Sequence, residues 1–507
     1  MAQQTGHART DEVMLPLGRP RLAQLGAPHV VPQLPTPIEA PYMVAFNPDV
    51  ASLLDMVDGV EHLTAFTEMF AGNRVPENAQ PVAHRYAGHQ FGIWAGQLGD
   101  GRAITLGEVR NSRGAAWEVQ LKGCGQTPFS RFGDGRAVLR STIREYLVSE
   151  AMAALGIPTT RALTIIGSDA PVYRETVETA AILTRVAPDL IRFGSFEWLF
   201  YANRMEALPR LADHVIDEHF PRLANLSGAQ RYRAWVERVI ALTAELIAAW
   251  QAVGFVHGVM NTDNMSVLGL TLDYGPYAFM ERFQPDWAPN HTDTAGRYAY
   301  NQQPAVGLWN LGRFVQAVLP LLGDSSDAAI AFGEQALEDY RGRYDTAWLR
   351  HMRAKLGLCT EQDNDAELIK DLLRIMAHGQ ADFTRTFRAL GGVAANADVG
   401  VAQFLAEFAA PAEPRQWLMR WRARVQGEQG RGSDASRARR MAAINPKYVL
   451  RTHLAQNAIT RAQSGDYSEI ARLHALLRRP FAEQPENAEY ARPATSSEAQ
   501  AVLSCSS

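Results

Sequence analysis

The sequence has few cysteines, no long uncharged apolar run and no strong excess of either charge. Its three cysteines, Cys124, Cys359 and Cys505, lie far apart and form no C-x-x-C pair, which argues against a disulfide framework or a zinc site and favours a reducing cytoplasm. No uncharged apolar run approaches the roughly 18 residues that a membrane-spanning helix needs, and the N-terminus lacks the basic-then-apolar order of an export signal. We therefore expect a cytoplasmic protein that neither crosses a membrane nor is exported.

The composition is that of a globular protein. Hydrophobic residues make up 47% of the 507 residues and charged residues 21%, so the chain can bury a core in two or more lobes. The formal net charge of -4 gives no electrostatic reason to expect a nucleic acid partner. An anionic nucleotide would need cations placed locally.

The segment HGVMNTDNMSVLGLTLDYG, which begins at His257, has the spacing of a protein-kinase catalytic segment. In the kinase motif H-R-D-x-x-x-x-N the Asn helps to hold Mg²⁺, and a D-F-G sequence follows. Here Asn264 lies seven residues after the His, and Asp273 opens a D-Y-G sequence. The position of the kinase catalytic Asp is Val259, which cannot accept a proton, and Asp263 is the one carboxylate inside the loop. The segment therefore belongs to an inactive kinase or to a different transferase.

The residues around this motif support the comparison with kinases. Apolar residues in 228–255 recur at helical spacing, and 266–272 has the composition of a short apolar strand that ends at the D-Y-G. Helix, loop, strand and D-x-G is the order found in a kinase.

The region before this motif has the pattern of a small strand-rich lobe. A hairpin is predicted from Arg102 to Gly123, with the turn at 111–114, and a helix follows over about 137–155. Three further apolar segments, TRALTII, PVYRET and AAILTRVA, are typical of strands. The predicted fold is α+β: a protein-kinase-like bilobal fold with a small strand-rich N-lobe and a larger helical C-lobe with extra helices.

The pattern divides the chain into four regions. These are an N-terminal arm and helices packed on the body, the N-lobe, the helical C-lobe with the catalytic loop, and a mobile C-terminal tail, at 1–95, 96–200, 201–480 and 481–507 respectively. Apolar periodicity further predicts helices at 49–75, 304–322, 326–341 and 365–376.

Two charged residues match a lysine–glutamate pair that kinases use at the nucleotide phosphates, and two arginines are further candidates for binding phosphate. Lys122 ends the second hairpin strand on its polar face, and Glu145 lies 23 residues on, inside the next helix, where a kinase places the glutamate that orients the lysine. Arg185 and Arg192, seven residues apart, flank the segment that follows AAILT. Their guanidinium groups suit phosphate oxygens, although two surface arginines would give the same pattern.

The pentapeptide GDGRA occurs twice, at 99–103 and 133–137. The first copy opens the hairpin and the second opens the helix. Glycines allow a backbone to approach phosphates closely, and a helix N-terminus favours an anion, whereas two plain Asp-Gly turns are the alternative.

Long stretches of the chain resemble the selenoprotein O family, also called the YdiU family, of kinase-like protein adenylyltransferases. The resemblance rests on YAGHQFGIWAGQLGDGRA, VQLKGCGQTPFSRFGDGRAVLRSTIREYL, LGIPTTRAL, HGVMNTDNMS, LDYGPYAFM, NPKYVLR and the C-terminal SCSS, and so extends over nearly the whole chain. It implies a kinase fold that binds ATP in a flipped orientation, with the γ-phosphate buried and the α-phosphate presented to an acceptor.

The resemblance also implies roles for individual residues. Glu145 would pair with Lys122, Asp263 would accept the proton of the acceptor, and Asn264 and Asp273 would hold Mg²⁺ or Mn²⁺. The nucleotide would be contacted by Gly99, Gly101, Arg102, Lys122, Asp134, Gly135, Arg185, Arg192 and Asp273. Some relatives carry selenocysteine where this chain has Cys505, which we expect to be exposed and reactive.

The leading functional hypothesis is transfer of AMP from ATP, or of UMP from UTP, to Ser, Thr or Tyr hydroxyls of proteins, with release of pyrophosphate. The expected partners are ATP and acceptor proteins, without a nucleic acid or a membrane. A kinase acting on a protein or small molecule, and a catalytically silent scaffold, remain alternatives at this point because a fold alone does not set the reaction.

Overall fold

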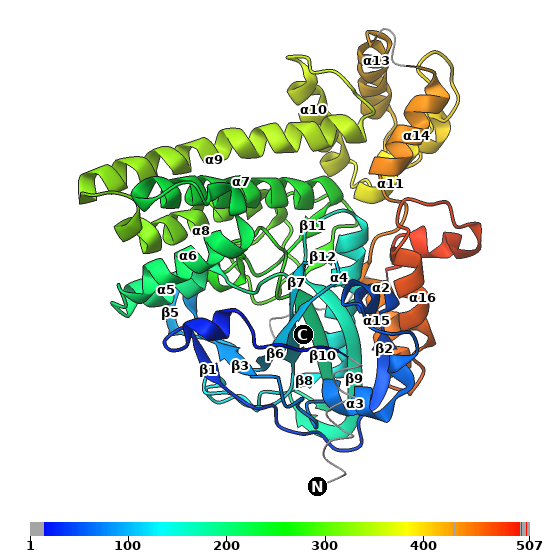
Figure 1. Ribbon diagram of the computed structural model, residues 1–507. Helices are drawn as coiled ribbons and strands as arrows, with labels where there is room; N and C mark the ends of the chain where they lie inside the picture. The colour runs from blue at the N-terminus through cyan, green and yellow to red at the C-terminus, as the bar shows by residue number, and fades with distance from the viewer. Residues whose placement is uncertain (1–14, 429–431, 497, 499–502, 504–507) are drawn as a thin grey trace.

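A computed structural model describes residues 15–428, 432–496, 498 and 503. An antiparallel sheet forms one end of the molecule, and long helices are stacked at the other end (Figure 1). The α+β class predicted from the sequence is confirmed. No helix in these described ranges is both long and apolar enough to cross a bilayer.

The main sheet has eight strands, seven of them in the order β1-β3-β6-β7-β10-β9-β2, with β8 paired to β10. Its strands are β1 Val30–Pro32, β2 Tyr42–Phe46, β3 Val82–His84, β6 Ala103–Arg110, β7 Ala116–Lys122, β8 Ala137–Val138, β9 Arg161–Tyr173 and β10 Val177–Ala187. Two separate two-stranded sheets are formed by β4 Ala87–Gln90 with β5 Ile93–Gln97, and by β11 Phe255–Val256 with β12 Ala278–Phe279.

The predicted hairpin is confirmed as β6 and β7, which pair from Ala103 opposite Lys122. The Asn111 side chain closes the turn, because its Oδ1 accepts hydrogen bonds from two backbone N–H groups, those of Arg113 and Ala115. The predicted strands TRALTII and PVYRET are not separate. They join into the single strand β9, which turns back into β10 at 174–176.

The helices pack on this sheet and on one another. They are α2 Pro48–Leu53, α3 Thr64–Phe70, α4 Leu139–Ala154, α5 Phe193–Tyr201, α6 Ala207–His219, α7 Gly228–Val253, α8 Gln303–Val318, α9 Ser326–Lys355, α10 Asp365–His378, α11 Phe383–Leu390, α12 Val401–Leu405, α13 Ala412–Gln426, α14 Asp434–Ile444, α15 Thr452–Ala462 and α16 Ser468–Leu477. Short 3-10 helices are η1 Leu22–Leu25, η2 Val60–His62, η3 Pro221–Leu223, η4 Thr262–Asn264, η5 Tyr300–Gln302, η6 Leu319–Leu321 and η7 Pro485–Ala491.

Three sequence predictions for helices and strands need correction. The helix predicted over 49–75 is broken into α2, η2 and α3, because Asp55 and Gly59 adopt positive φ angles of 55° and 81°. The strand predicted at 266–272 does not form, since a turn at Gly269 (φ 66°) interrupts it. The N-terminal arm is also less irregular than expected, because β1 and β2 join the main sheet.

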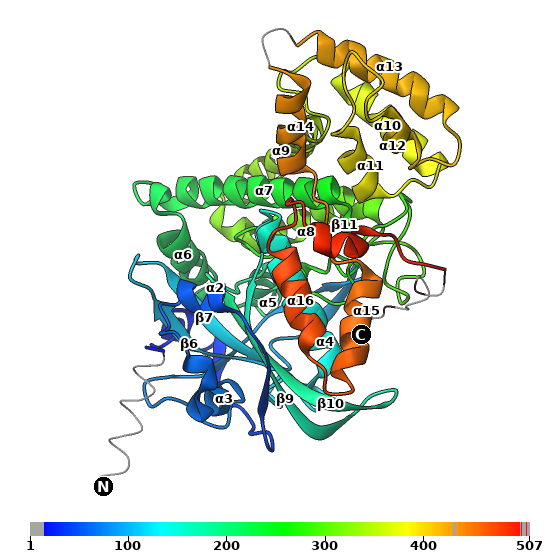
Figure 2. The ribbon, with the colours of Figure 1, turned by 90° about the vertical axis from the view of Figure 1, so that its right-hand side faces the viewer.

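The prediction of a mobile tail is wrong for residues 481–496. These residues lie against the body, where Tyr448 donates a hydrogen bond to the backbone oxygen of Gln484 and Tyr490 is buried. The tail residue Cys505 lies outside the described residues. Figure 2 shows the preceding helices α15 and α16 alongside α4, so the C-terminal region supports the helix that follows the hairpin.

The hydrophobic core consists of three main clusters. One lies between α2, α3 and the sheet, a central one joins α4 to α5, α7, α8 and α16, and a third holds α9 to α14 together. The central cluster contains side chains of the sheet, of α7 and of the loop that follows α7, so it fixes the position of that loop.

Candidate active site

A cavity of about 620 Å³ lies between the sheet and the loop that follows α7. Ten of the twelve residues that the sequence singles out line its wall: Gly99, Gly101, Arg102, Lys122, Asp134, Gly135, Arg185, Asp263, Asn264 and Asp273. The other two, Arg192 and Glu145, lie one layer behind the wall and contact Asp273 and Lys122. Predictions made from separate parts of the sequence, from Gly99 to Asp273, therefore meet at one site.

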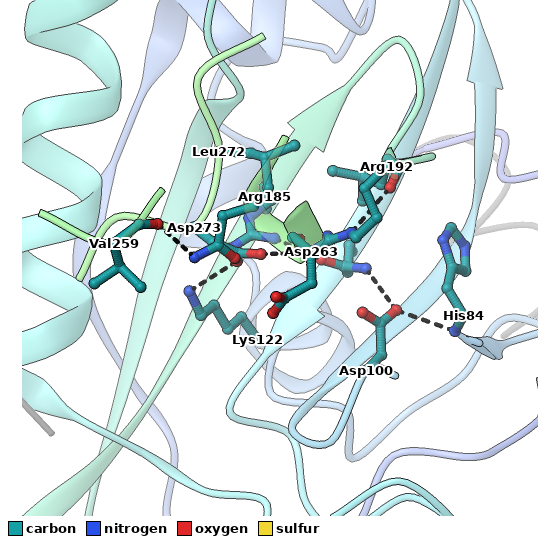
Figure 3. A network of polar contacts seen from close by, with 12 residues as sticks. His84, Asp100, Lys122, Arg185, Arg192, Val259, Asp263, Leu272 and Asp273 are labelled. Carbon is teal, nitrogen blue, oxygen red and sulfur yellow. Dashed lines mark hydrogen bonds and ion pairs between the residues drawn. The ribbon is translucent and has the colours of Figure 1, made fainter. Parts of the chain in front are cut away.

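Asp273 is the centre of a network of buried charges (Figure 3). Its Oδ1 accepts from Arg185 at 2.6 Å and lies 3.4 Å from the ammonium of Lys122, and its Oδ2 accepts from Arg192 at 2.5 Å. Both guanidinium groups are almost completely buried. Burial alone would raise the pKa of Asp273, but the charges of these three cations outweigh it and hold the pKa well below the usual value.

The local backbone explains how Asp273 reaches this position. The segment before it pairs with two different parts of the chain, Ser266 with Arg192 and Thr271 with Thr159, instead of forming one strand. His257 is buried and its Nε2 lies 3.0 Å from the carbonyl oxygen of Leu272, next to Asp273. Asp273 itself has a φ of 58°, a left-handed conformation that Asp and Asn tolerate better than most residues.

Lys122 and Glu145 form the ion pair that the sequence predicts. The Nζ atom of Lys122 lies 2.6 Å from Oε2 of Glu145, which projects from α4. The second oxygen of Glu145 accepts from Arg185 at 2.6 Å, so one carboxylate balances two cations. Burial lowers the pKa of Lys122 despite the nearby carboxylates. The polar face predicted for β7 is thus directed into a buried charge network and not into solvent.

We expect Lys122→Ala to lower kcat/KM for ATP by roughly a hundredfold, since one charge-assisted contact to phosphate is lost. Glu145→Ala should lower it less, because Glu145 acts by orienting the cations. Steady-state kinetics of the two single mutants and the double mutant test this shared role. The double mutant should be close to Lys122→Ala, and a purely additive loss would contradict it. In thermal melts, Glu145→Ala should be the less stable single mutant because it leaves two buried cations without their carboxylate.

Asp263 occupies the cavity wall in a different environment. It is 7% exposed, and burial raises its pKa to about 7, although a hydrogen bond donated by Gln90 and the charge of Arg192 both act to lower the pKa. A carboxyl group with this pKa is suited to accept a proton at neutral pH. Val259, at the position of the kinase catalytic Asp, also lines the cavity and offers only its backbone oxygen, which accepts from the amide of Asn264 at 2.9 Å.

Asn264 and Asp273 are the predicted metal ligands, and both line the cavity. Because Asn264 Nδ2 donates to Val259, its Oδ1 is the amide atom left for a ligand. An amide oxygen with a carboxylate oxygen suits Mg²⁺ or Mn²⁺, which bind few protein ligands and complete their shell with phosphate and water. No cluster of three or more His, Cys, Asp or Glu side chains is arranged for a metal in the described chain, so a metal here would depend on this pair.

Both GDGRA copies contribute residues to the cavity wall. Gly99 has a φ of 96°, and a Cβ atom there would lie 2.4 Å from the ring of Phe129. Gly135 has a φ of 69°, and a Cβ there would lie 2.1 Å from the backbone of Gly125. Both glycines are therefore required by loop packing as well as being available to a phosphate. The second copy runs into the two-residue strand β8, and α4 begins only at Leu139, so this copy does not open the helix directly as the sequence predicts.

The sequence reasoning missed several side chains of the site. Asp100 and Gln120 form a buried hydrogen bond of 3.2 Å, and Gln120 also accepts from Arg185 at 3.1 Å. Arg174 forms a two-pronged ion pair with Asp134, which ties the second GDGRA loop to the tip of β9. The repeat itself could have indicated Asp100, whereas no local signal marks Arg174. Tyr86, whose ring lies 4.4 Å from the guanidinium carbon of Arg192, was likewise not predicted.

Comparisons with known proteins agree with this geometry. The chain is 51% identical over 474 residues to protein nucleotidyltransferase YdiU of Thioalkalivibrio sulfidiphilus, with 94% of this chain and 95% of that protein covered. It is 49% identical over 507 residues to protein nucleotidyltransferase YdiU of Cupriavidus metallidurans (97% and 92% covered) and 50% identical over 474 residues to that of Myxococcus xanthus (93% and 95% covered). The family model described as protein adenylyltransferase SelO matches residues 18–478. The resemblance noted in the sequence is thereby confirmed, and the chain belongs to the SelO family.

Proposed function

We propose that this protein transfers AMP from ATP to Ser, Thr or Tyr hydroxyl groups of acceptor proteins and releases pyrophosphate. The observation that carries the proposal is the pairing of two features in one cavity. Lys122 and Arg185 line the cavity and contact Asp273. Asp263, a carboxyl group suited to accept a proton, lines the same cavity. UTP is proposed as a second donor, of UMP, because these groups would contact phosphate and not the base.

The cations support a nucleotide bound with its terminal phosphate innermost. Lys122 and Arg185 line the cavity, Arg192 lies just behind its wall, and all three contact Asp273; the two arginines are almost completely buried. A terminal phosphate held there would not be free to leave with an acceptor. The α-phosphate would then lie nearer to the loop that carries Asp263. Arg102, with the glycines of the two GDGRA loops, would contact the remainder of the nucleotide.

The residues divide the reaction between them. The acceptor oxygen forms a bond to the α-phosphorus, the bond from that phosphorus to the bridging oxygen of the β-phosphate breaks, and pyrophosphate leaves. Asp263 takes the proton of the acceptor hydroxyl. Asn264 and Asp273 would hold Mg²⁺ or Mn²⁺, which would supply positive charge to the phosphates. Lys122 and Arg185 orient the phosphates so that the attacked phosphorus faces the acceptor.

We propose a kinase-like bilobal arrangement as the framework of this site. The small lobe, predicted at 96–200, would hold α4 and the sheet strands from β6 to β10, to which β1, β2 and β3 of the N-terminal region are added; the region from α6 to α16 would be the helical lobe, within 201–480. The Lys122–Glu145 pair and the order of His257, Asn264 and Asp273 support this reading. A cytoplasmic location is also proposed, because ATP is abundant there and Cys124 and Cys359 are free thiols.

The fate of the α-phosphate of ATP tests the proposed function. AMP transfer attaches the α-phosphate to protein and releases the other two phosphates together. A kinase attaches the γ-phosphate, and a silent scaffold attaches neither.

A further inference from the structure

The hairpin β4–β5 stands apart from the main sheet and packs on the loop that carries Asp263. Its strand β4 lies against α5 and η4. The two turn residues, Phe91 and Gly92, have φ angles of 51° and 83°, both positive, as in the tight hairpin turns that reverse a chain in two residues. The turn of the hairpin therefore lies at the cavity, and Gln90 and Phe91 are part of the cavity wall.

Three consecutive hairpin residues bond to three consecutive loop residues. The backbone N–H of His89 donates to Oγ1 of Thr262 at 2.7 Å, and that of Phe91 donates to Oδ1 of Asn261 at 3.2 Å. Between them, the side-chain Nε2 of Gln90 donates to Oδ2 of Asp263 at 3.2 Å. The backbone of the hairpin thus bonds to two side chains of the loop, and the Gln90 amide bonds to the carboxylate of Asp263.

The two carboxylate oxygens of Asp263 differ in their surroundings. Oδ1 is buried and has no hydrogen-bond partner among the described residues. It packs against Gly88, where an added Cβ atom would lie 2.8 Å from it. Because Asp263 still lines the cavity, Oδ2 is the oxygen that remains available to a substrate. That oxygen is the one Gln90 holds.

A rigid layer supports this contact from behind. The Nδ1 atom of His89 bonds to Oε2 of Glu197, a completely buried side chain of α5. The His89 ring lies among three aromatic rings, with centroid separations of 5.1 Å to Trp94, 6.0 Å to Tyr201 and 5.4 Å to Trp309. Gln90 therefore projects from a backbone that has little freedom to move.

We propose that Gln90 is a positioning residue for AMP transfer: its amide holds Oδ2 of Asp263 at the cavity wall, where that oxygen receives the proton of the acceptor hydroxyl. The inference rests on the proposed function, in which Asp263 is the proton acceptor. A carboxylate oxygen has room for the amide N–H and for the acceptor O–H at the same time. Gln90 acts through Asp263 and makes no bond to the reacting phosphorus.

Gln90→Met tests the proposal, because methionine keeps the length of the side chain and removes the amide. We expect kcat for AMP transfer to fall about ten- to a hundredfold, as for the loss of one hydrogen bond to a charged group, with KM for ATP unchanged. The assay follows pyrophosphate release with Mg²⁺, ATP and whichever acceptor the wild type labels, the enzyme itself or casein. An unchanged kcat, or a rise in KM for ATP alone, would overturn the inference.

Gln97→Met is the matched control. Gln97 is an exposed glutamine at the end of the same hairpin and is not part of the cavity wall, so its replacement should leave kcat unchanged. Gln90→Glu is a second variant of nearly identical shape. It replaces the donor with a carboxylate that repels Asp263, and it should lower kcat at least as much as Gln90→Met.

A double mutant separates this inference from the function on which it rests. In an Asp263→Ala background, Gln90→Met should cause no further loss of kcat, because the group on which Gln90 acts is gone. If the losses instead multiply, Gln90 has a role independent of Asp263 and the inference is wrong. If Asp263→Ala alone leaves kcat unchanged, the proposed role of Asp263 fails instead. Circular dichroism and thermal melts of each variant identify any that is misfolded.

Discussion

Asp273→Ala is expected to lower AMP transfer by roughly a thousandfold or more, because the change removes a predicted metal ligand and the carboxylate around which three cations gather. From the sequence alone, a loop carboxylate is expected to contribute little to the fold. The structure changes that expectation. Without Asp273, Arg185 and Arg192 remain buried with fewer partners, and the free energy of unfolding should fall by about 3 kcal/mol.

Asp273→Asn is the control that separates charge from shape. Asparagine tolerates the left-handed backbone at this position and fills the same space, so it should be less destabilising than alanine while still impairing transfer. Radiolabel transfer and denaturant unfolding of both variants measure the two effects. Wild-type activity of Asp273→Ala with Mg²⁺ or Mn²⁺ would mean that the metal site is misassigned.

The second large effect is expected for Asp263→Ala, which should lower turnover about a hundred- to ten-thousandfold, the usual range for loss of a general base. ATP binding should change little, because the hydrogen bond between Asp263 and the cation Arg192 is made by the backbone oxygen of Asp263, which alanine keeps. The fold should be retained, since burial already disfavours the charged form of Asp263 and its Oδ1 makes no hydrogen bond within the described chain. Single-turnover kinetics and calorimetric titration with an ATP analogue measure these quantities separately.

Asp263→Asn provides the matched comparison, because it keeps the shape of the side chain and a hydrogen-bonding oxygen but cannot accept a proton in the same way. Its loss of turnover should match that of Asp263→Ala. A variant that binds ATP normally and still turns over at the wild-type rate would show that another group takes the proton.

The elements that the sequence predicts correctly are those with strong local patterns. Period-two alternation and a polar turn define the hairpin that ends at Lys122, and helical periodicity defines α4 and α7. The segment 266–272 has the composition of a strand, but its backbone bonds are divided between Ile191 and Pro158, and such pairing leaves no mark in the segment itself. Apolar composition there reflects burial and not strand pairing.

The candidate site likewise contains residue pairs that a local sequence pattern predicts and pairs that no local pattern predicts. Lys122 and Glu145 lie 23 residues apart in a known order of elements, so their pairing could be predicted. Gln90 and Asp263 are 173 residues apart and meet only because β4 packs on η4. Arg174 and Asp134 belong to two loop tips whose contact depends on the length of β9, which the sequence divides into two strands. Contacts of this kind can be recognised only from the tertiary structure.

The most direct test of the account compares ATP labelled at the α-phosphate with ATP labelled at the γ-phosphate, each incubated with the protein, Mg²⁺ and casein. The charge network around Asp273 and the proton acceptor on the cavity wall predict that only the α-label becomes bound to protein and that pyrophosphate is released in equal amount. Asp273→Ala should abolish the signal. Transfer of the γ-label with release of ADP would show that the protein is a kinase and would contradict the proposed nucleotide orientation.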